Sequence, residues 1–539
     1  MITSIIDFTK KNPFASLFIT LVCLVLYQCL NLFWGFEMAD SGFHLTAYEN
    51  VFDAPDCVSY NFMYYLTNVV GGTIMRLFPW IGVFGFRVVG VLFIDVSIVL
   101  IFLCLRNEIP ACHLLIGATL TVVSYFCPYS FCNGILSCFL YVCFLLLLYK
   151  GLRNNIVFFV FWGGFLAGIN VFTRLPNILA VGVVVIILFH HFIEDGIVKL
   201  DWRLSTFFLF GVVLGVLSVF LIIVLLNHWH PFYDCLNILI SKANGNHPID
   251  KNYTVFNLIW IQIYFYLSAM VFICVFFTFF YVNDRIKSRK WHIVFVVLGA
   301  IAIFYYVYLN MNLGKGYEPL WGLCFIGCLI TIKKNNRLSL LSSLALFMLL
   351  VEILGSGGGN NHGSLPALLA APIASYALLN RQNFIFVLVA CLALFLKVFK
   401  QGNFADFGPL TDKTFSINTK ECQYIRTTQE RAEVINQSLD YLRSNLNRGD
   451  TLLVFDCAPM MNYLTHTRPA GGQTWPALGD LKPFRTPPKI LIHKFSDFTM
   501  PALQTRGVPT GNLVIDNYMK EHRYKLVFEN HFFMLFIPN

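Results

Sequence analysis

Long apolar runs separated by short polar connections make up most of the chain as far as residue 398. Many of these runs are close to the length of about 20 apolar residues that an α-helix needs to cross a bilayer. The pattern predicts an α-helical polytopic membrane protein with about thirteen transmembrane helices. The runs fall near residues 14–33, 85–105, 111–126, 131–149, 155–172, 176–193, 205–226, 256–281, 292–310, 319–332, 338–354, 366–380 and 383–398.

The pattern changes after residue 398. Apolar positions now recur at helical spacing or in short strand-like runs, which is typical of a small α/β domain. We therefore expect a transmembrane domain of residues 1–398, with a first outer loop at about 35–82, and a C-terminal α/β domain of residues 399–539. The elements expected in the second domain are helices at 427–447, 459–464 and 512–521, strands at 451–455 and 489–493, and a hairpin of 524–528 with 532–537.

The composition agrees with many membrane spans. Apolar residues make up 57% of the chain and charged residues 12%, which is about half of the charged share of ordinary globular domains. This composition excludes a soluble protein, a disordered chain and a secreted disulfide scaffold. Most of the 16 cysteines lie inside apolar runs, where Cys acts as a small apolar residue. Two disulfides remain open, Cys127 with Cys132 and Cys422 with Cys457.

The basic residues predict an orientation. The net charge of +9 comes from Lys and Arg scattered through short connections, so no nucleic-acid partner is expected. With a cytoplasmic N-terminus, most of these residues fall in inside connections, in agreement with the positive-inside rule. An odd number of helices then places the C-terminal α/β domain on the outer, extracytoplasmic face.

The first outer loop carries the strongest candidate for chemistry. Its segment Gly35–Leu45 places Glu37, Asp40 and His44 just beyond the outer end of the first apolar run. An aspartate near glycine and an aromatic residue suits a carboxylate that is held at the membrane surface and accepts a proton from a hydroxyl group. The alternative is structural, with Asp40 or the serine after it capping a helix of about 42–51. The local sequence leaves both open.

Three segments together resemble the GT-C superfamily of membrane glycosyltransferases, which use polyprenyl-phosphate-linked sugars as donors. The Asp40 segment is similar to the acidic motif of the family's first outer loop. That motif is often Asp-Glu before an aromatic residue, whereas here Ser41 follows Asp40. Residues 168–177, Gly-Ile-Asn-Val-Phe-Thr-Arg-Leu-Pro-Asn, are similar to a joint between two middle spans. Residues 441–450 and 463–470 look like parts of the family's extracytoplasmic domain.

The resemblance implies an inverting sugar transfer at the outer face of a bacterial inner membrane. An acceptor hydroxyl attacks the anomeric carbon while the lipid phosphate leaves, through an oxocarbenium-like transition state. Asp40 is the expected general base, and its water-facing position predicts an ionised side chain. The implied partners are a polyprenyl-phosphate sugar donor, a lipid, glycan or protein acceptor, and membrane lipid. No cofactor is required. Glu37 and Asp40 are two acidic residues that could bind a divalent metal ion, so metal binding stays an alternative.

The departing lipid phosphate calls for cations, because positive charge stabilises a transition state in which negative charge develops. The candidates for donor-phosphate binding on the expected outer face are Arg76, Arg174 and Lys315. Lys315 lies between two glycines whose backbone N–H groups can approach an anion. Each of the three has a plain alternative, either snorkelling at the membrane interface or capping of a helix end.

Other polar residues of the expected outer face are candidates for substrate or metal binding. A glycine-rich loop carries two asparagines and a histidine, which suits a sugar-binding loop and equally a flexible turn. His228 and His230 are spaced to chelate zinc, but only Asp234 lies near them in the sequence as a further ligand. The substrate-binding candidates are Glu37, His44, Tyr317, Glu318, Asn360, Asn361 and His362.

Three other functions remain open. An oligosaccharide ligase or polymerase would use lipid pyrophosphate donors and a large outer loop such as residues 227–254. A lipid or solute transporter is disfavoured, because no internal repeat is found and few acidic residues lie within apolar runs. Asp95 and Glu352 are the exceptions, and Asp95 is expected either to pair with Arg87 or a serine or to act in a relay. A membrane scaffold is the third alternative.

Overall fold

The computed structural model describes residues 2–126, 129–243, 285–310, 318–334, 336–352, 364–379, 384–403, 406–455, 458–475, 487–493 and 513–539, with residues 354 and 484 and isolated positions between 260 and 282. The chain forms two compact units, which we call the helical unit and the mixed unit. The helical unit consists of Met1–Asn31, Val89–Leu221 and Asn252–Phe404. The mixed unit consists of Leu32–Val88, Ile222–Lys251 and Ala405–Asn539.

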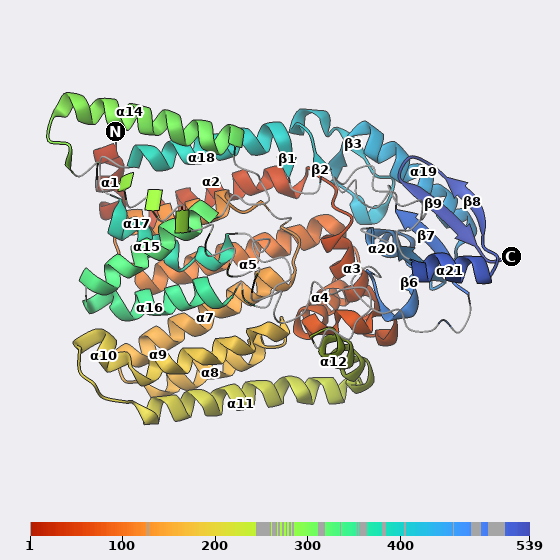
Figure 1. The fold of residues 1–539 in the computed structure, drawn as a ribbon, viewed down its shortest axis with the longest axis horizontal. Helices are drawn as coiled ribbons and strands as arrows, with labels where there is room; N and C mark the ends of the chain where they lie inside the picture. Colours follow the sequence, from red (N-terminus) through yellow and green to blue (C-terminus); the bar gives the residue numbers. More distant parts are fainter. Residues whose placement is uncertain are drawn as a thin grey trace. The chain divides into compact units, whose positions relative to one another are not determined.

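The helical unit is built from helices whose ends lie close to those of the predicted apolar runs (Figure 1). Three of them, α2, α5 and α11, continue into the mixed unit at one end. The elements are α1 (Ile2–Lys11), α2 (Pro13–Leu32), α5 (Gly82–Leu105), α6 (Ala111–Val123), α7 (Asn133–Arg153), α8 (Val157–Asn170), η2 (Leu175–Val183), α9 (Val184–Leu188), α10 (His190–Asp195), α11 (Trp202–Leu225), α14 (Arg289–Tyr305), η4 (Tyr306–Asn310), α15 (Glu318–Lys334), α16 (Asn336–Val351), η7 (Leu365–Ala367), α17 (Ala370–Leu378), α18 (Phe384–Gln401) and the short strand β1 (Gly402–Asn403).

Among the described residues, six helices are long and apolar enough to cross a membrane. They are α2, α5, α7, α11, residues Lys290–Leu309 and α18, and four shorter apolar helices accompany them. The predicted number of about thirteen is not reached within the described residues. One reason is that run 176–193 is divided into η2, α9 and α10, because the backbone leaves helical geometry at Phe189. Run 256–281 lies largely outside the described residues.

Two helices of the helical unit meet along a seam of glycines. Gly164 and Gly168 on α8 face α11, whose Gly211 and Gly215 have the same spacing. A Cβ atom on Gly164 would lie 2.1 Å from the Phe208 carbonyl oxygen, and one on Gly168 or Gly211 would be almost as close to a facing carbonyl. The backbones therefore touch, as in membrane helix pairs with small residues four positions apart.

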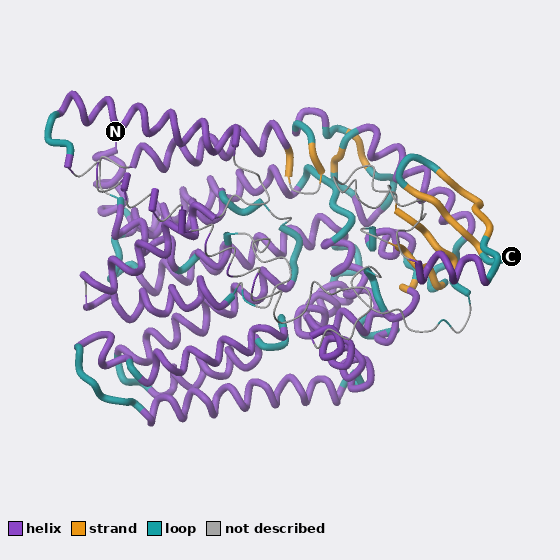
Figure 2. The backbone as a smooth tube through the Cα atoms, in the orientation of Figure 1, coloured by secondary structure: helices purple, strands orange, loops and turns teal. Residues whose placement is uncertain are grey.

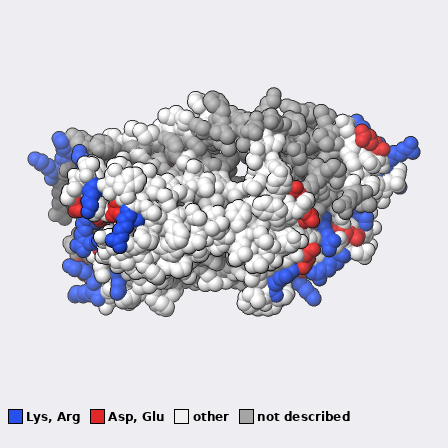
Figure 3. Space-filling model, turned by 90° about the horizontal axis from the view of Figure 1, so that it is seen from below, with Lys and Arg blue, Asp and Glu red and all other residues white. Residues whose placement is uncertain are grey.

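Much of the outer surface of the helical unit is apolar. Exposed side chains of α11 include Phe207, Phe210, Val213, Leu217 and Leu221. In the space-filling view, a broad area of the visible face has no Lys, Arg, Asp or Glu (Figure 3). Apolar surface of this extent is unfavourable in water and suits contact with lipid.

The mixed unit contains every element that the sequence predicts for the tail, and Figure 2 shows the strands gathered in this part of the chain. Its elements are α3 (Asp40–Asn50), η1 (Pro55–Tyr64), α4 (Tyr65–Leu77), α12 (Trp229–Ala243), β2 (Asp406–Phe407), η8 (Leu410–Asp412), β3 (Phe415–Ser416), η9 (Lys420–Cys422), β4 (Arg426–Thr427), α19 (Gln429–Asn445), β5 (Thr451–Phe455), α20 (Met460–Thr465), β6 (Arg468–Pro469), η10 (Ala470–Gly472), β7 (Lys489–His493), α21 (Leu513–Glu521), β8 (Lys525–Glu529) and β9 (Phe533–Ile537).

A five-stranded sheet forms the core of the tail, in the order β6-β5-β7-β9-β8. Strand β5 is parallel to β6 and β7, and β9 is antiparallel to β7 and β8. Leu453, Phe455, Ile490 and Ile492 lie in one buried cluster with Ile515 of α21. The alternation of side chains along β5 and β7 places these four on one sheet face, which explains why α21 packs there.

The division into units differs from the predicted boundary at residue 398. The first loop and residues 222–251 belong with the tail. Backbone hydrogen bonds join the first loop to the tail: Gly35 N–H donates to Arg426 O at 2.8 Å, and Met460 N–H donates to Met38 O at 3.0 Å. The tail therefore does not fold around its own residues alone, and the predicted catalytic loop is part of the same body.

Candidate functional site

Asp40 is the first residue of α3, and the preceding glutamate fixes the loop in front of it. The Glu37 carboxylate accepts the backbone N–H groups of Ala39, Asp40 and Ser41 at 2.5–2.7 Å. A helix leaves these donors unpaired at its N-terminus, and a negative charge there also interacts favourably with the helix dipole. Glu37 therefore caps α3 and holds Asp40 in the first turn.

This cap changes two expectations. The helix begins at Asp40 rather than near residue 42, and the capping side chain is Glu37 instead of Asp40 or Ser41. Glu37 is buried, and its two oxygens are occupied by the α3 backbone. The substrate or metal contact predicted for Glu37 is therefore not supported by its surroundings. The Asp40 side chain, by contrast, is left out of the cap.

Asp40 is exposed at its side chain, yet enough protein surrounds it to change its acidity. Loss of hydration, and then repulsion by the Glu37 carboxylate, raise the pKa of Asp40 to about 7. The sequence led us to expect a carboxylate that stays ionised. A pKa near neutrality is instead the value at which a carboxylate is most effective in taking up and releasing a proton at physiological pH.

Asp406 anchors the same loop from the tail. Its Oδ2 accepts the Phe36 N–H at 2.8 Å and the Thr427 hydroxyl at 2.7 Å. The Lys413 ammonium donates to the Asp406 backbone oxygen and lies 3.7 Å from Oδ1, and an Arg431 nitrogen lies 4.0 Å from Oδ1. All three charged side chains are buried. A buried carboxylate is stable only with partners of this kind. Removal of one charged residue of the cluster would therefore leave the others buried without compensation.

Arg87 fixes the other side of the loop. Its guanidinium donates to the backbone oxygens of Leu32 at 3.1 Å and Gly35 at 2.6 Å, and its side chain is buried. Pairing with Arg87 was one of the alternatives for Asp95, but Asp95 instead accepts a hydrogen bond from Gln28 at 3.2 Å. The sequence signal for Arg87 is a lone cation at the start of an apolar run, and it does not reveal the partners.

The far end of α3 is clamped by a histidine between two carboxylates. His466 Nδ1 lies 2.6 Å from Glu49 of α3, and its Nε2 lies 3.2 Å from Glu421. The hydrogen bonds to Glu421 and Glu49 raise the pKa of His466 to about 9. Burial would raise the pKa of Glu421, but hydrogen bonds from His466 and Thr419 outweigh it and lower the value to about 2. A protonated His466 therefore joins α3 to the tail at neutral pH.

α3 also lies directly against α20. The Thr46 hydroxyl donates to the Pro459 carbonyl at 3.0 Å. A Cβ atom on Gly42 would lie 2.1 Å from the backbone nitrogen of Met460, so only glycine allows the two helices to approach this closely. The glycine two residues after Asp40 thus has a packing role.

His44, a predicted substrate contact, lies in an aromatic cluster. Its ring centroid is 5.3 Å from that of Phe43, 5.7 Å from that of Tyr64 and 5.9 Å from that of Tyr48. The side chain is buried. These contacts favour a packing role for His44 next to the candidate base over direct binding of a sugar.

The predicted phosphate-binding cations are in different environments. Arg76, near the end of α4, is more than half exposed and pairs with the exposed Asp53 at 2.5 Å. Exposed pairs of this kind contribute about 0–1 kcal/mol, so a phosphate can displace Asp53. Arg174 is buried in the helical unit, where it donates to Glu352 at 3.2 Å and to the Leu354 carbonyl at 3.0 Å. Its charge is already neutralised, which disfavours it as a phosphate ligand.

The remaining substrate-binding candidates are not tested by the described residues. Glu318, at the start of α15, is described and buried. Lys315, Tyr317, Asn360, Asn361 and His362 lie outside the described residues. The same is true of Cys127 and Cys457, one member of each disulfide that we left open.

The histidine pair proposed for zinc is separated by its surroundings. His228 is buried and shares a hydrogen bond of 3.2 Å with the Tyr65 hydroxyl. His230 is exposed and lies 3.2 Å from Asp56 and 3.5 Å from Asp234. The two side chains have different partners, so the structure does not bring them together as the zinc site that their spacing left open.

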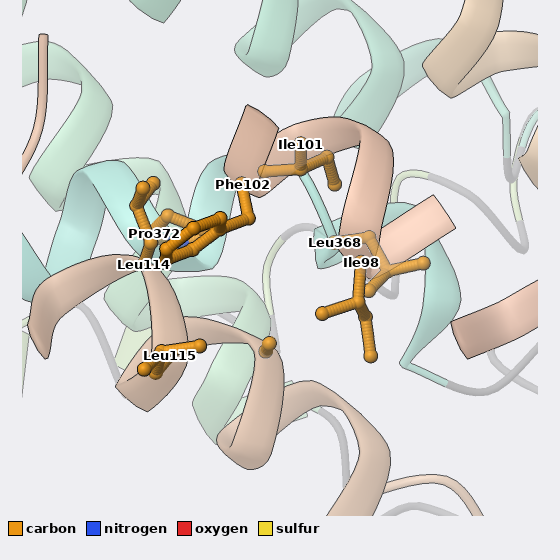
Figure 4. Close-up of a pocket in the computed structure, with 8 residues that line it drawn as sticks. Ile98, Ile101, Phe102, Leu114, Leu115, Leu368 and Pro372 are labelled. Carbon is orange, nitrogen blue, oxygen red and sulfur yellow. The ribbon is translucent and has the colours of Figure 1, made fainter. Parts of the chain in front are cut away.

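A small cavity in the helical unit is not a substrate site. It has a volume of about 10 Å³ and is lined by apolar side chains of α5, α6 and α17 and by Leu368, including Ile98, Leu114 and Pro372 (Figure 4). This volume is about that of one water molecule, and the walls offer no polar partners. The cavity is a packing defect between helices.

The chain has weak similarity to two groups of solved structures. ArnT from Cupriavidus metallidurans bound to undecaprenyl phosphate matches with a TM-score of 0.44 and 12% identity, covering 97% of this chain and 98% of ArnT. The Archaeoglobus fulgidus oligosaccharyltransferase in complex with Zn and sulfate matches with a TM-score of 0.46 and 12% identity, covering 84% of this chain and 62% of that one. No family model matches the chain, and no curated protein matches it.

Proposed function

We propose that the protein is a membrane glycosyltransferase that moves a sugar from a polyprenyl-phosphate donor to an acceptor hydroxyl with inversion. Asp40 is its general base. The observation that carries the proposal is the combination at Asp40: an exposed carboxylate with a pKa of about 7, at the start of a helix held at both ends by polar side-chain contacts. A titrating group in such a rigid setting is typical of acid–base catalysis.

The proposed reaction forms one bond and breaks one. The acceptor oxygen bonds to the anomeric carbon, the bond between that carbon and the donor phosphate breaks, and the acceptor proton passes to Asp40. Polyprenyl phosphate is the leaving group, and its new negative charge requires a cation. Arg76 is the better supported of the two described candidates, because its partner Asp53 is exposed and readily displaced. Lys315 stays a candidate from the sequence.

The resemblance of the sequence to GT-C enzymes supports the same donor class. One of the similar solved structures holds undecaprenyl phosphate, which is a polyprenyl phosphate. The six long apolar helices among the described residues agree with an enzyme that takes its donor from the membrane. The sugar and the acceptor class, lipid, glycan or protein, are left to experiment.

The test is sugar transfer by the purified protein in lipid vesicles, with radiolabelled polyprenyl-phosphate sugars and extracted acceptors. We expect Asp40→Asn to lower the rate by about 10²–10⁴, because the proton acceptor is lost. The matched control is Asp56→Asn, an exposed carboxylate of the same loop region, which we expect to retain transfer. The wild-type rate should rise with pH as Asp40 ionises around pH 7.

A stability measurement separates loss of the base from loss of the fold. The folded chain holds a proton on Asp40 up to about pH 7, whereas the unfolded chain loses it near the ordinary value of 3.8. Ionised Asp40 therefore opposes folding at pH above 7, and Asp40→Asn should melt at the same or a higher temperature there. Equal transfer by wild type and Asp40→Asn would contradict the base. Transfer from lipid pyrophosphate donors only, or translocation without transfer, would favour the ligase or the transporter instead.

A further inference from the structure

A cluster of two histidines and an aspartate lies in the helical unit. His190 and His191 follow the break after α9, and Asp201 stands just before α11. Asp201 Oδ2 lies 4.0 Å from His190 Nε2 and 3.8 Å from His191 Nε2. Among the described residues, this is the group of three whose ligand atoms come within 4.8 Å of one another.

The His190 ring is held in the tautomer that a metal requires. Its Nδ1 lies 2.9 Å from the Ile187 carbonyl oxygen. A carbonyl can only accept a hydrogen bond, so Nδ1 carries the proton and Nε2 keeps its lone pair, directed toward Asp201. A backbone carbonyl that fixes one ring nitrogen in this way is the usual support of a histidine ligand.

Asp201 is oriented in the same manner. Its Oδ1 accepts the Leu204 N–H at 2.9 Å as the cap of α11, and its own N–H donates to Leu188 O at 3.1 Å. This leaves Oδ2 for the two histidines. His190 is buried, whereas His191 is 28% and Asp201 14% exposed, so water can reach the group from one side only.

The spacing of the three ligand atoms suits a metal better than direct ion pairs. Hydrogen-bonded partners would approach to roughly 2.8 Å. Two ligands of a tetrahedral zinc ion, each bonded at about 2.0–2.1 Å, lie roughly 3.3 Å apart, which is nearer to the 3.8 and 4.0 Å found here than a direct hydrogen bond is. The nearby Asp195 and Lys199 act on the charge of His191 with opposite signs.

We propose that His190, His191 and Asp201 bind a divalent transition metal, with Zn²⁺ as the expected ion. Two imidazole nitrogens and one carboxylate oxygen form a ligand set that zinc accepts, and water fills the fourth position on the exposed side. The metal links the end of α9 and the start of α10 to the start of α11, and so closes the connection of residues 196–200. This proposal does not rest on the proposed glycosyl transfer, whose base Asp40 and described cation Arg76 lie in the mixed unit.

The test is Zn²⁺ binding to full-length protein in detergent, without a histidine tag and after removal of metal by a chelator. Titration in competition with a chromophoric chelator should show one equivalent in the wild type. His191→Gln and Asp201→Asn should each weaken binding by at least about tenfold. Asn keeps an oxygen for the Leu204 N–H, so Asp201→Asn preserves the cap of α11. The matched control is His230→Gln, which removes an exposed histidine between two acidic residues.

Two readouts make the outcome decisive. Added Zn²⁺ should raise the melting temperature of the wild type and of His230→Gln, and leave that of the double variant His191→Gln/Asp201→Asn unchanged. Cu²⁺ bound in place of zinc should show two nitrogen ligands by electron paramagnetic resonance. The proposal is overturned if the double variant binds Zn²⁺ as tightly as the wild type, if His230→Gln alone abolishes binding, or if the wild type binds none.

Discussion

Among the described residues, one buried ion pair of the helical unit stands by itself, whereas buried ions of the mixed unit form a cluster that joins distant segments. Arg174 and Glu352 face each other in the helical unit, and each side chain is about 3% exposed or less. In the mixed unit, Asp406 alone has contacts with Lys413, Arg431 and the backbone of Phe36. Both arrangements neutralise charge, but only the second also fixes the position of a loop.

The difference shows what the buried charges are for. A pair within a helical bundle can be exchanged for apolar side chains of similar volume without loss of the fold, because helix packing alone holds the backbone. A cluster that accepts backbone N–H groups cannot be exchanged, because those donors would be left unpaired. The mixed unit uses the second kind at the loop that presents Asp40, and this rigidity is what a catalytic carboxylate needs.

The largest effect should follow from Asp406→Asn. The substitution leaves the buried Lys413 ammonium beside a neutral amide, and breaking a buried ion pair costs about 3–5 kcal/mol. The unfolding free energy in detergent, measured by denaturant titration, should fall by this amount, and transfer activity should fall with it. Asp412→Asn, an exposed carboxylate six residues away, is the control and should change neither quantity. A stable and active Asp406→Asn protein would show that the cluster does not hold the loop.

A double-mutant cycle at Arg174 and Glu352 tests whether the buried ion pair of the helical unit can be replaced by apolar side chains. Either single change, Arg174→Leu or Glu352→Leu, leaves an unpaired buried charge and should cost about 3 kcal/mol. The double variant should recover most of that loss, because no charge remains. Thermal melting of the four proteins measures the cycle. A double variant that is stable but inactive in transfer would restore Arg174 as a donor-phosphate contact.

A smaller, pH-dependent effect is expected at the His466 clamp. The pKa of His466 is about 9 in the folded chain and near 6.5 in the unfolded chain, so the clamp stabilises fully below about pH 6.5 and is lost as pH rises through 9. The side chain is 32% exposed, so the contribution after solvent screening is about 1 kcal/mol. His466→Asn suits the left-handed backbone, φ +52°, of this position.

Melting temperatures of wild type and His466→Asn should therefore differ at pH 6 and converge near pH 10. The lowered pKa of Glu421 has the opposite effect on the pH dependence of stability. The stabilisation by ionised Glu421 is fully present above the ordinary pKa of 4.5 and is lost as pH falls through 2. A constant difference between the two proteins from pH 6 to pH 10 would mean that His466 stabilises the clamp by packing rather than by charge.

Much of the secondary structure follows from the sequence. The apolar runs place α2, α5, α7 and α11 within a few residues, because a helix that crosses a bilayer needs about 20 apolar residues. Strand β5 is recognised as easily from its apolar run, since it is buried in the sheet interior. The break after α9 is not recognised, because an apolar run shows no difference between a straight and an interrupted helix.

The candidate site, unlike the secondary structure, follows from the sequence only in part. Asp40 stands out in the sequence as an acidic residue just after a span, and the resemblance to GT-C enzymes draws attention to it. Glu37, which caps the helix, and Asp406 and His466, which hold the loop and the helix in place, are not recognisable from the sequence. Phe36 and its partner Asp406 are 370 residues apart, and Glu49 and His466 are 417 apart. Hydrogen-bond partners at such separations leave no pattern in the local sequence.

The sequence by itself thus determined that the chain is a membrane protein with an α/β tail, and that Asp40 is the leading candidate for the base. Hydrophobic periodicity fixes local structure, because each helix or strand must match the polarity of what surrounds it. The tertiary structure alone decided that Glu37 caps the helix, that Arg174 is neutralised by Glu352, and that the pKa of Asp40 lies near 7. These properties depend on hydration and on charges brought within a few ångströms, and only the folded chain sets those distances.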